Sequence, residues 1–444
     1  MNEPANQINE TIPDEGIDKG LARLTEDRIE KTILRVLNVE AGARLKVYVE
    51  TCVHCGLCSE GCHYYLSHDN DPRFSPAGKV KQTLWEMIRK KGRVSKDFMR
   101  QAAVIAATQC NLCKRCAMYC PFGIDVAYLM SVVRRITHLL GLTPLYIQAT
   151  AHSHSVSMNQ MWVKEDEWPD TLQWQEEEAR SEIPKLRIPL EKEGADIMYS
   201  VIGPEPKFQA QLIYQAAVMM NVAGVNWTMP ATPGWDNSDM AMFTGDSELM
   251  GRIKRAHFET AARLKVKKIV MGECGHAFRS VYDMGNRWLG WKMPPIPVLH
   301  AIEFYYDMIK EGRIKITKKY TEPVTLHDPC NVVRGRGLHE KARFVVGAIC
   351  ETLIEMHPNR EHNYCCCAGG GVINCGPPYK MVRINGNRIK AEQLFAVKAR
   401  GAKTLIAPCH NCHSGLEDIN HYHGLEMNIK FIGDILYQVM EKPE

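Results

Sequence analysis

The chain has 444 residues, and its 45% hydrophobic content is enough for two or three globular domains with cores of their own. The formal net charge is only +4, and the scattered lysines and arginines form no basic stripe of the kind that binds nucleic acid. No run approaches 18 apolar residues, which predicts no membrane-spanning helix, and the acidic start lacks the apolar core of a secretion signal. We therefore expect a cytoplasmic protein, in which 17 cysteines indicate metal binding rather than disulfides.

A helical extension is expected over residues 1–45, followed by a helical ferredoxin domain over 46–143 with two cysteine motifs. Both motifs have the spacing C-x2-C-x2-C-x3-C, which is typical of a pair of cubane [4Fe-4S] clusters. In that arrangement the fourth cysteine of each motif binds the other cluster. The predicted ligands are Cys52, Cys55, Cys58 and Cys120 for the first cubane, and Cys110, Cys113, Cys116 and Cys62 for the second. A pair of zinc knuckles would explain neither the third cysteine of each motif nor the repeat.

Helices are predicted on both sides of the second motif. Val80, Leu84, Met87 and Ile88 recur at helical spacing between the motifs, and a second helix is expected in DVAYLMSVVRRITHLLG, ended by Gly141 and Pro144. His63 stands where the second motif has Pro121. It is interpreted as a tolerated substitution, with a hydrogen bond to a cluster ligand as the alternative.

Residues 144–195 mix tryptophans, acids and prolines without a sustained helix or strand period, and they are interpreted as a linker. Beyond them the chain repeats itself. LKVKKIVMGECGHAF at 264–278 matches RGAKTLIAPCHNCHSGL at 400–416, and PIPVLHAIEFYYDMI matches NIKFIGDILYQVM. Each copy predicts a short strand followed by a helix, so we expect two α/β domains with parallel strands, over 196–315 and 316–444. The predicted fold class is α+β multidomain.

The second copy carries five cysteines in a characteristic order: one in LHDPCNVVRGRG, two at the start of CCCAGGG, and two in APCHNCHSG. This order resembles the CCG domain of heterodisulfide reductase catalytic subunits of the HdrD type, fused behind an iron–sulfur domain, and nearly the whole chain resembles the DsrK family of the sulfite-reductase-associated DsrMKJOP complex. The resemblance implies a noncubane [4Fe-4S] cluster at which a disulfide is reduced or formed. Its implied ligands, which are also the implied catalytic residues, are Cys330, Cys365, Cys366, Cys409 and Cys412.

The same resemblance implies partners and a location. Electrons would come from a membrane haem b subunit of the DsrM type that oxidises quinol, and the implied substrate is a disulfide or trisulfide on a small DsrC-type sulfur carrier in dissimilatory sulfur metabolism. The chain would then lie on the cytoplasmic face of the inner membrane, held by partner subunits. The sequence contains no dinucleotide loop or P-loop, which agrees with a protein as electron donor.

Several residues near the predicted noncubane site have more than one interpretation. Cys367 replaces the usual glycine of the CCG motif and is a spare ligand, a thiol near the substrate or a neutral replacement, and Cys375 is equally open, whereas Cys350 is expected to be a core thiol. Histidines in this region are metal ligands, proton donors or hydrogen-bonding partners of the backbone; they are His327, His410 and His413. The three glycines 369–371 are expected to let the backbone approach the cluster closely.

The first copy keeps only Cys274, with Ala277 where the second copy has Cys412, and MFTGDSELMG lies in the region of the cysteine–glycine turn. We therefore predict a single noncubane site, with the first copy as scaffold. Two other functions in this group are a reductase of the coenzyme M–coenzyme B heterodisulfide and an electron-transfer subunit like those of glycolate oxidase and anaerobic glycerol-3-phosphate dehydrogenase. A non-catalytic redox sensor is the third alternative.

Overall fold

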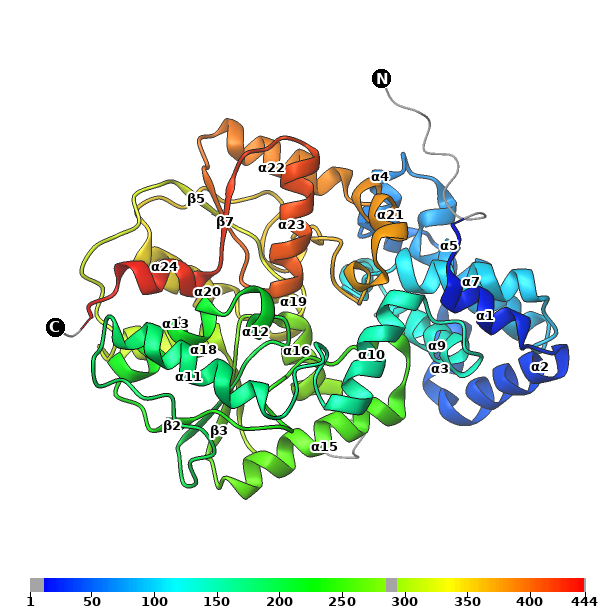
Figure 1. Cartoon of the computed structure of the whole chain (residues 1–444). Coiled ribbons are helices and arrows are strands. Elements are labelled where there is room, and N and C mark those ends of the chain that lie inside the picture. The colour runs from blue at the N-terminus through cyan, green and yellow to red at the C-terminus, as the bar shows by residue number, and fades with distance from the viewer. Residues whose placement is uncertain (1–11, 285–293, 443–444) are drawn as a thin grey trace. The chain divides into compact units, whose positions relative to one another are not determined.

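The computed structural model describes residues 12–284 and 294–442, and these fall into two compact units (Figure 1). Unit 1 comprises the chain up to Thr150 and two later segments, 240–247 and 364–392. Unit 2 comprises 151–239, 248–363 and the C-terminal part from Gln393. The cysteine triplet at 365–367 therefore belongs to the unit that holds the ferredoxin motifs.

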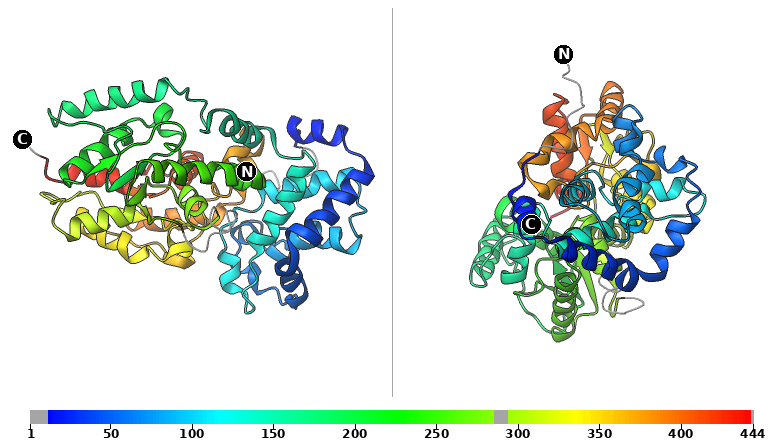
Figure 2. Two further views of the ribbon diagram at one scale, coloured as in Figure 1. Left: turned by 90° about the horizontal axis from the view of Figure 1, so that it is seen from below. Right: turned by 90° about the vertical axis from the view of Figure 1, so that its right-hand side faces the viewer.

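Unit 1 is helical, as Figure 2 shows for its blue and cyan helices. Its N-terminal helices are α1 (Glu15–Ala22), α2 (Glu26–Arg35), α3 (Gly42–Thr51), α4 (His63–Ser67), α5 (Pro76–Val80), α6 (Glu86–Arg89), α7 (Lys96–Thr108), α8 (Arg115–Tyr119) and α9 (Val126–Leu139). A π-helical turn, Lys81–Trp85, joins α5 to α6, so the predicted helix between the motifs is confirmed; Leu84 and Met87 are buried on it. Helix α9 ends just before Gly141, as predicted.

The later segments of unit 1 add short helices: α14 (Ala241–Thr244), two 3-10 turns (Ile373–Cys375 and Pro377–Tyr379), α21 (Lys380–Asn385) and the first residues of α22 (Arg388–Ala399). Sequence proximity does not place these segments beside the ferredoxin motifs, because more than 100 residues separate α9 from the start of α14.

The expectation of no sustained helix in residues 144–195 was wrong. Helix α10 (Leu145–Ser157) and helix α11 (Glu167–Arg180) occupy most of this stretch. Trp168, Leu172, Gln175 and Ala179 form a buried stripe on α11 at helical spacing. Pro169 hides this signal in the sequence, but it lies in the first turn, where a proline has no hydrogen bond to break.

Unit 2 contains two parallel sheets, which confirms the predicted α/β pair and the multidomain α+β class. The first sheet has the order β2 (Trp227–Thr228), β1 (Ile197–Ser200), β3 (Lys268–Met271) and β4 (Val298–His300). The second has the order β5 (Val324–Leu326), β6 (Thr404–Ile406) and β7 (Asn428–Lys430). Ile197 pairs with Lys268 in the first sheet, and Val324 pairs with Thr404 in the second.

Helices flank these strands in the same way in each copy. They are α12 (Glu205–Phe208), α13 (Gln211–Val222), α15 (Ser247–Arg263), α16 (Gly275–Arg279) and α18 (Ala301–Lys310) in the first copy, and α19 (Val333–Arg336), α20 (His339–Ile349), α23 (His410–Tyr422) and α24 (Ile432–Val439) in the second. The matching strand–helix pairs are β3–α16 with β6–α23 and β4–α18 with β7–α24, so the predicted duplication is confirmed. Helix α13 packs on α24 and α18 packs on α20, which joins the two copies into one core.

Candidate iron–sulfur sites

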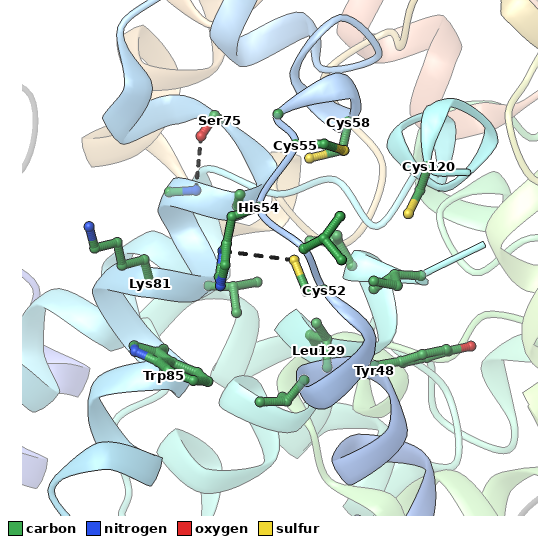
Figure 3. A pocket seen from close by; sticks show the side chains of 18 of the residues that line it. Tyr48, Cys52, His54, Cys55, Cys58, Ser75, Lys81, Trp85, Cys120 and Leu129 are labelled. Carbon is green, nitrogen blue, oxygen red and sulfur yellow. Dashed lines mark hydrogen bonds between the residues drawn. The ribbon is translucent and has the colours of Figure 1, made fainter. Parts of the chain in front are cut away.

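Four cysteines line a cavity of about 470 Å³ in unit 1, and they are the four assigned above to the first cubane (Figure 3). Three of them come from the first motif, and Cys120 comes from the end of the second. Apolar side chains close the other walls, among them Tyr48, Trp85 and Leu129. This donor set fits a [4Fe-4S] cubane, which binds four thiolates. The crossed pattern of ligands that the spacing predicts is therefore compatible with the structure.

The two motif loops share a backbone conformation that suits an anionic cluster. His54 and Gly56 in the first motif have φ values of 55° and 82°, and the equivalent Leu112 and Lys114 in the second have 52° and 62°. Left-handed residues between right-handed ones turn successive N–H groups inward, and such concave loops bind anions, including iron–sulfur clusters. Three of these four residues are not glycine, so both loops contain residues with the conformational strain of a positive φ.

A second, smaller cavity is lined by Cys62, Cys110, Cys113 and Cys116, the set assigned to the second cubane. Burial raises the pKa of the Cys116 thiol well above its usual value, and the nearby Cys113, Cys62 and Cys110 add to the shift. The nearly buried Lys79 brings a cation to this cavity, with Nζ 3.4 Å from Cys62 Sγ. Four thiols gathered in one cavity become ligands only with a metal cation to stabilise their thiolate form, which a cluster provides.

The loop that carries the cysteine triplet packs tightly on the second motif, within unit 1. A Cβ at Gly370 would come within 2.5 Å of the carbonyl oxygen of Asn111, and a Cβ at Gly371 would meet Ile147 and Phe243 at 2.5 and 2.7 Å. Asn111 Nδ2 also donates a hydrogen bond to Gly369 O at 2.8 Å. The glycines do permit a close approach, but the neighbours that require it here are protein atoms of unit 1. The expectation that a cluster requires it is not tested.

Arg134 of α9 fastens this loop to the rest of unit 1. Its guanidinium donates to the carbonyl of Ala106 in the last turn of α7 (2.8 Å) and to that of Cys110 just beyond this helix (2.8 Å). It also donates to Phe243 O (3.0 Å) and to Gly370 O (2.5 Å). The last carbonyls of a helix have no intrahelical amide partner, and a cation there is favourable. Because Arg134 is 3% exposed, it holds both later segments against α7 and α9 from a buried position.

The first cysteine of the triplet lies beside the second cubane site. The Sγ atoms of Cys365 and Cys113 and a ring nitrogen of His63 lie within 4.8 Å of one another. The backbone N–H of Cys367 also donates to Cys365 Sγ at 3.3 Å. Interpreting His63 as a tolerated substitution missed this contact, which only the folding of residues 364–392 against the motif creates. The signal in the sequence was its position next to the ligand Cys62.

The remaining thiols of unit 1 are buried. Cys367 has φ 58°, which explains why a glycine suits this position, and its Sγ donates to Asn111 Oδ1 at 3.5 Å. Burial raises the pKa of Cys367 to about 12, although a hydrogen bond with Tyr64 acts in the opposite direction. Burial also raises the pKa of Cys375 to about 12. Neither thiol lines the two cavities described above. In unit 2, Cys350 lies in the hydrophobic core, where a core thiol was expected.

Of the five implied noncubane ligands, Cys330, Cys409 and Cys412 belong to unit 2, whereas Cys365 and Cys366 belong to unit 1. Cys330 follows β5 and Cys409 follows β6, which are neighbouring parallel strands, and Cys412 lies in the first turn of α23. Such loops at the carboxyl ends of parallel strands are common binding positions. A cluster that joins the ligands of both units stays a prediction.

A buried ion-pair network holds the loop of Cys330. Arg343 of α20 binds Asp328 at 2.9 Å through both terminal nitrogens, and it also binds Glu355 at 2.6 Å. The backbone N–H of Arg360 donates to the same aspartate at 2.6 Å. Because Asp328 is buried and lies two residues before Cys330, this bidentate pair fixes the direction in which the loop leaves β5.

Histidines follow the same strand ends. His327 lies at the end of β5, with Nδ1 3.3 Å from Asn363 Nδ2. His410 and His413 lie on α23 rather than on a loop: His410 Nε2 is 3.0 Å from Glu205 Oε1, and His413 stacks on Phe431 with ring centroids 4.4 Å apart. His410 and His413 thus contact side chains, Glu205 and Phe431. The buried His410–Glu205 pair can hold a proton next to Cys409.

The first copy contributes a thiol that sequence reasoning left aside. Cys274 begins α16 after β3, as Cys409 begins α23 after β6, and the two thiols are hydrogen-bonded neighbours. The N–H of Gly275 donates to Cys409 Sγ at 3.3 Å, and His276 Nδ1 lies 2.9 Å from Cys274 Sγ. Burial raises the pKa of the Cys274 thiol well above its usual value. The signal was the equivalence of these two cysteines in the repeat.

Elsewhere the first copy contains a buried ion pair. Asp239 Oδ2 lies 3.7 Å from Lys254 Nζ, and both side chains are fully buried. Asn237 Nδ2 donates to Ser200 O at the end of β1. Residues 196–315 contain no cysteine besides Cys274. A single noncubane site stays a prediction.

Comparison with known families finds two matches. A 4Fe-4S dicluster domain matches residues 48–124, and a cysteine-rich domain named CCG matches residues 324–417. The first covers both cubane motifs, and the second covers all five implied noncubane ligands, including the cysteine triplet.

The chain is also similar to components of known oxidoreductases. It is 26% identical over 397 residues to "Hdr-like menaquinol oxidoreductase iron-sulfur subunit 2" of Archaeoglobus fulgidus, covering 76% of this chain and 69% of that protein. It is 25% identical over 381 residues to a component of the dihydromethanophenazine:CoB–CoM heterodisulfide reductase of Methanosarcina barkeri, covering 83% of this chain and 88% of that protein. The chain is thus similar to iron–sulfur subunits of heterodisulfide-reductase-like complexes, and it is an oxidoreductase.

A weaker match is to a quinone oxidoreductase. The EtfAB:quinone oxidoreductase of Syntrophomonas wolfei is 22% identical over 480 residues, covering 98% of this chain and 64% of that protein. Among solved structures, glutamate racemase RacE1 of Bacillus anthracis matches at 13% identity with a TM-score of 0.25, covering 55% of this chain and 80% of that one, which is too distant to support any argument. Among the described residues, no helix has the length and apolarity needed to cross a bilayer.

Proposed function

We propose that this oxidoreductase is the iron–sulfur subunit of a membrane-associated complex that reduces, or in a sulfur oxidiser forms, a disulfide or trisulfide on a small sulfur-carrier protein of the DsrC type. A haem b subunit of the DsrM type would oxidise quinol and deliver the electrons. The complex would hold this chain, as a DsrK-like subunit, on the cytoplasmic face of the inner membrane. The name of the Archaeoglobus relative, a menaquinol oxidoreductase subunit, supports the quinol as electron source.

One observation carries the proposal. The cysteine triplet folds into the same unit as both cubane cavities, and Cys365 Sγ lies within 4.8 Å of Cys113 Sγ. A cysteine proposed to bind the site cluster thus lies near a cysteine proposed to bind the second cubane. This proximity suits a chain of electron carriers, because electrons would pass from the two cubanes to the triplet within one unit.

The residues divide the chemistry among them. Bound iron–sulfur clusters supply electrons one at a time, and cleavage of one S–S bond takes two electrons and two protons and gives two thiols. Eight cysteines of the ferredoxin motifs would hold the two cubanes, and the five cysteines of the CCG motif would hold the noncubane cluster. His410, hydrogen-bonded to Glu205, can hold one of the two protons at Nε2.

The test uses the purified complex, reduced with dithionite under anaerobic conditions and mixed with the oxidised carrier. Carrier thiols are counted by mass after alkylation, and two new thiols are expected for each disulfide. The Cys366→Ser variant should release none while it keeps the cubane signals. The core variant Cys350→Ser is the matched control and should release both thiols. Release of no thiols by the unmodified complex would contradict the proposal.

A second candidate function is reduction of a low-molecular-weight heterodisulfide, because the Methanosarcina relatives bear that name over 83% of this chain. Rapid turnover of the coenzyme M–coenzyme B adduct without thiol release from the carrier would favour it. Iron content tests both candidates: three four-iron clusters give about 12 irons per chain. A fully reconstituted preparation with about eight irons and only cubane spectra would contradict the noncubane site.

A further inference from the structure

His63 has a buried ring nitrogen that no hydrogen bond explains. The side chain is 3% exposed, and Nδ1 has no hydrogen-bonding partner among the described residues. Leaving such an atom without a partner costs free energy comparable to a lost hydrogen bond. A buried polar atom without a partner therefore needs an explanation, and an ion that binds it is one of the usual ones.

The tautomer of His63 follows from its neighbour Asn111. Asn111 Nδ2 donates to Gly369 O at 2.8 Å, which directs its Oδ1 toward His63 Nε2 at 2.9 Å. Because an amide oxygen only accepts, Nε2 must carry the hydrogen. In the neutral ring Nδ1 then carries the lone pair. A metal ligand histidine typically has this arrangement, with its other ring nitrogen donating to an oxygen that fixes the ring.

The surroundings of His63 supply the other ligands of a metal. His63 lines the second cubane cavity, and one of its two ring nitrogens forms a group with Cys113 Sγ and Cys365 Sγ in which all atoms are within 4.8 Å of one another. Nε2 is already hydrogen-bonded to Asn111, which leaves Nδ1 as the nitrogen available to a metal. Metal–ligand bonds to nitrogen and sulfur are about 2.0–2.3 Å long, so two ligand atoms of one tetrahedral ion lie about 3.5 Å apart, which is inside the 4.8 Å limit of this group. Cys365 is itself 3% exposed. The group is thus a buried imidazole facing two thiols.

We propose that His63 Nδ1 is an iron ligand at the contact between the second cubane and the cysteine triplet, where it completes the coordination of the iron held by Cys365. This inference rests on the proposed function, since it assumes iron–sulfur clusters in these cavities. Iron is favoured over zinc because Cys113 belongs to a four-cysteine cubane set. Imidazole in place of thiolate is an established ligation of iron–sulfur clusters. The ring then lies on the path between the two clusters, with Asn111 holding it in place.

The test is nitrogen hyperfine spectroscopy on the dithionite-reduced complex, which needs no substrate. Protein labelled with ¹⁵N-histidine should show a strongly coupled histidine nitrogen on one cluster, and His63→Gln should lose it while the iron content stays unchanged. His54 provides the matched control, because its Nδ1 lies 3.9 Å from Cys52 Sγ at the other cavity. His54→Gln should leave the coupled nitrogen in place.

Absence of any strongly coupled histidine nitrogen in the labelled, unsubstituted protein would overturn the proposal, and so would a signal lost in His54→Gln but kept in His63→Gln. Stoichiometric zinc that disappears in His63→Gln would overturn the assignment to iron. If the His63 variant fails to assemble, the labelled unsubstituted protein still decides, because its spectrum requires no substitution. Failure of carrier reduction together with a coupled nitrogen would contradict the proposed substrate and leave the ligand assignment intact.

Discussion

Arg134→Met removes the guanidinium that ties the cysteine-triplet loop to the ferredoxin helices. The methionine keeps most of the aliphatic stem, so the change isolates the donors. Four hydrogen bonds of 3.0 Å or shorter are lost, to Ala106, Cys110, Phe243 and Gly370. Each bond from a charged donor contributes about 1.5–3 kcal/mol. Because the variant no longer has to bury a charge, the net loss is smaller than their sum, about 3–5 kcal/mol.

This loss converts into a shift of the melting temperature. The entropy of unfolding is about 2.1 cal/mol/K per residue, so the expected decrease is about 4 °C if the whole chain unfolds together and about 10 °C if unit 1 unfolds alone. The assay is calorimetry of the cluster-loaded protein at one fixed scan rate, since unfolding that releases iron is irreversible. Arg89→Met is the control, because its ion pair with Glu86 is exposed and contributes less than about 1 kcal/mol.

The site should respond as well as the stability. Since Arg134 binds Gly370, its loss should loosen Cys365 from the second cubane, so carrier reduction should fall while the cubane spectra remain. A variant that melts within about 1 °C of the unsubstituted protein would refute the reasoning, because it would show that these carbonyls find other partners at no cost.

Three further changes test separate features. Lys79→Met removes a buried cation 3.4 Å from Cys62 Sγ and should lower the reduction potential of the second cubane by on the order of 100 mV. This magnitude is that of a unit charge at about 5 Å with an effective dielectric constant of about 20. EPR-monitored redox titration measures the potential, and the control Lys90→Met, at an exposed site, should leave it unchanged. Cys367→Gly relieves a backbone strain at φ 58° but removes a small buried thiol, so the two effects on the free energy of unfolding should nearly cancel. About 12 irons per chain should remain, and loss of four irons would show that Cys367 is a ligand. Burial lowers the pKa of His154 to about 4, so below about pH 6.5 the unfolded chain binds a proton at this histidine that the folded chain does not bind. The free energy of unfolding should therefore fall by up to about 1.4 kcal/mol per pH unit as the pH decreases from 6.5 toward 4. His154→Leu should reduce that slope in melting experiments between pH 6.5 and 5, whereas a slope equal to that of the exposed-site variant His152→Asn would contradict the assignment.

Local spacing was enough to predict the cubane motifs, because all eight cysteines lie within two short loops whose geometry follows from the residues between them. The duplication was equally accessible, since matching strand–helix pairs repeat the same apolar pattern, as β4–α18 and β7–α24 show. Helix α11 was missed because its buried stripe is interrupted in the sequence by charged residues and begins beside Pro169. The prolines and charged residues of this stretch were given more weight than the helical spacing of its buried residues.

Contacts between distant segments were beyond sequence reasoning. Asn111 and Gly369 are 258 residues apart, and neither residue type reveals that one amide will bind the other's carbonyl. The same holds for Cys274 and Cys409, which meet only because the two copies place equivalent strand ends together. Two clues were present in the sequence: Asn111 follows the predicted ligand Cys110, and Cys274 matches Cys409 in the repeat.

The divergence of the two copies separates what the loop needs for packing from what it needs for metal. Gly245 and Gly371 lie eight residues after Asn237 and Asn363, respectively, and both have a left-handed backbone, with φ of 88° and 79°. A Cβ at Gly245 would meet the backbone of Arg134 at 2.7 Å, and one at Gly371 would meet Phe243 at the same distance. Both glycines therefore permit close packing within unit 1, and only the turn at Gly371 also carries thiols.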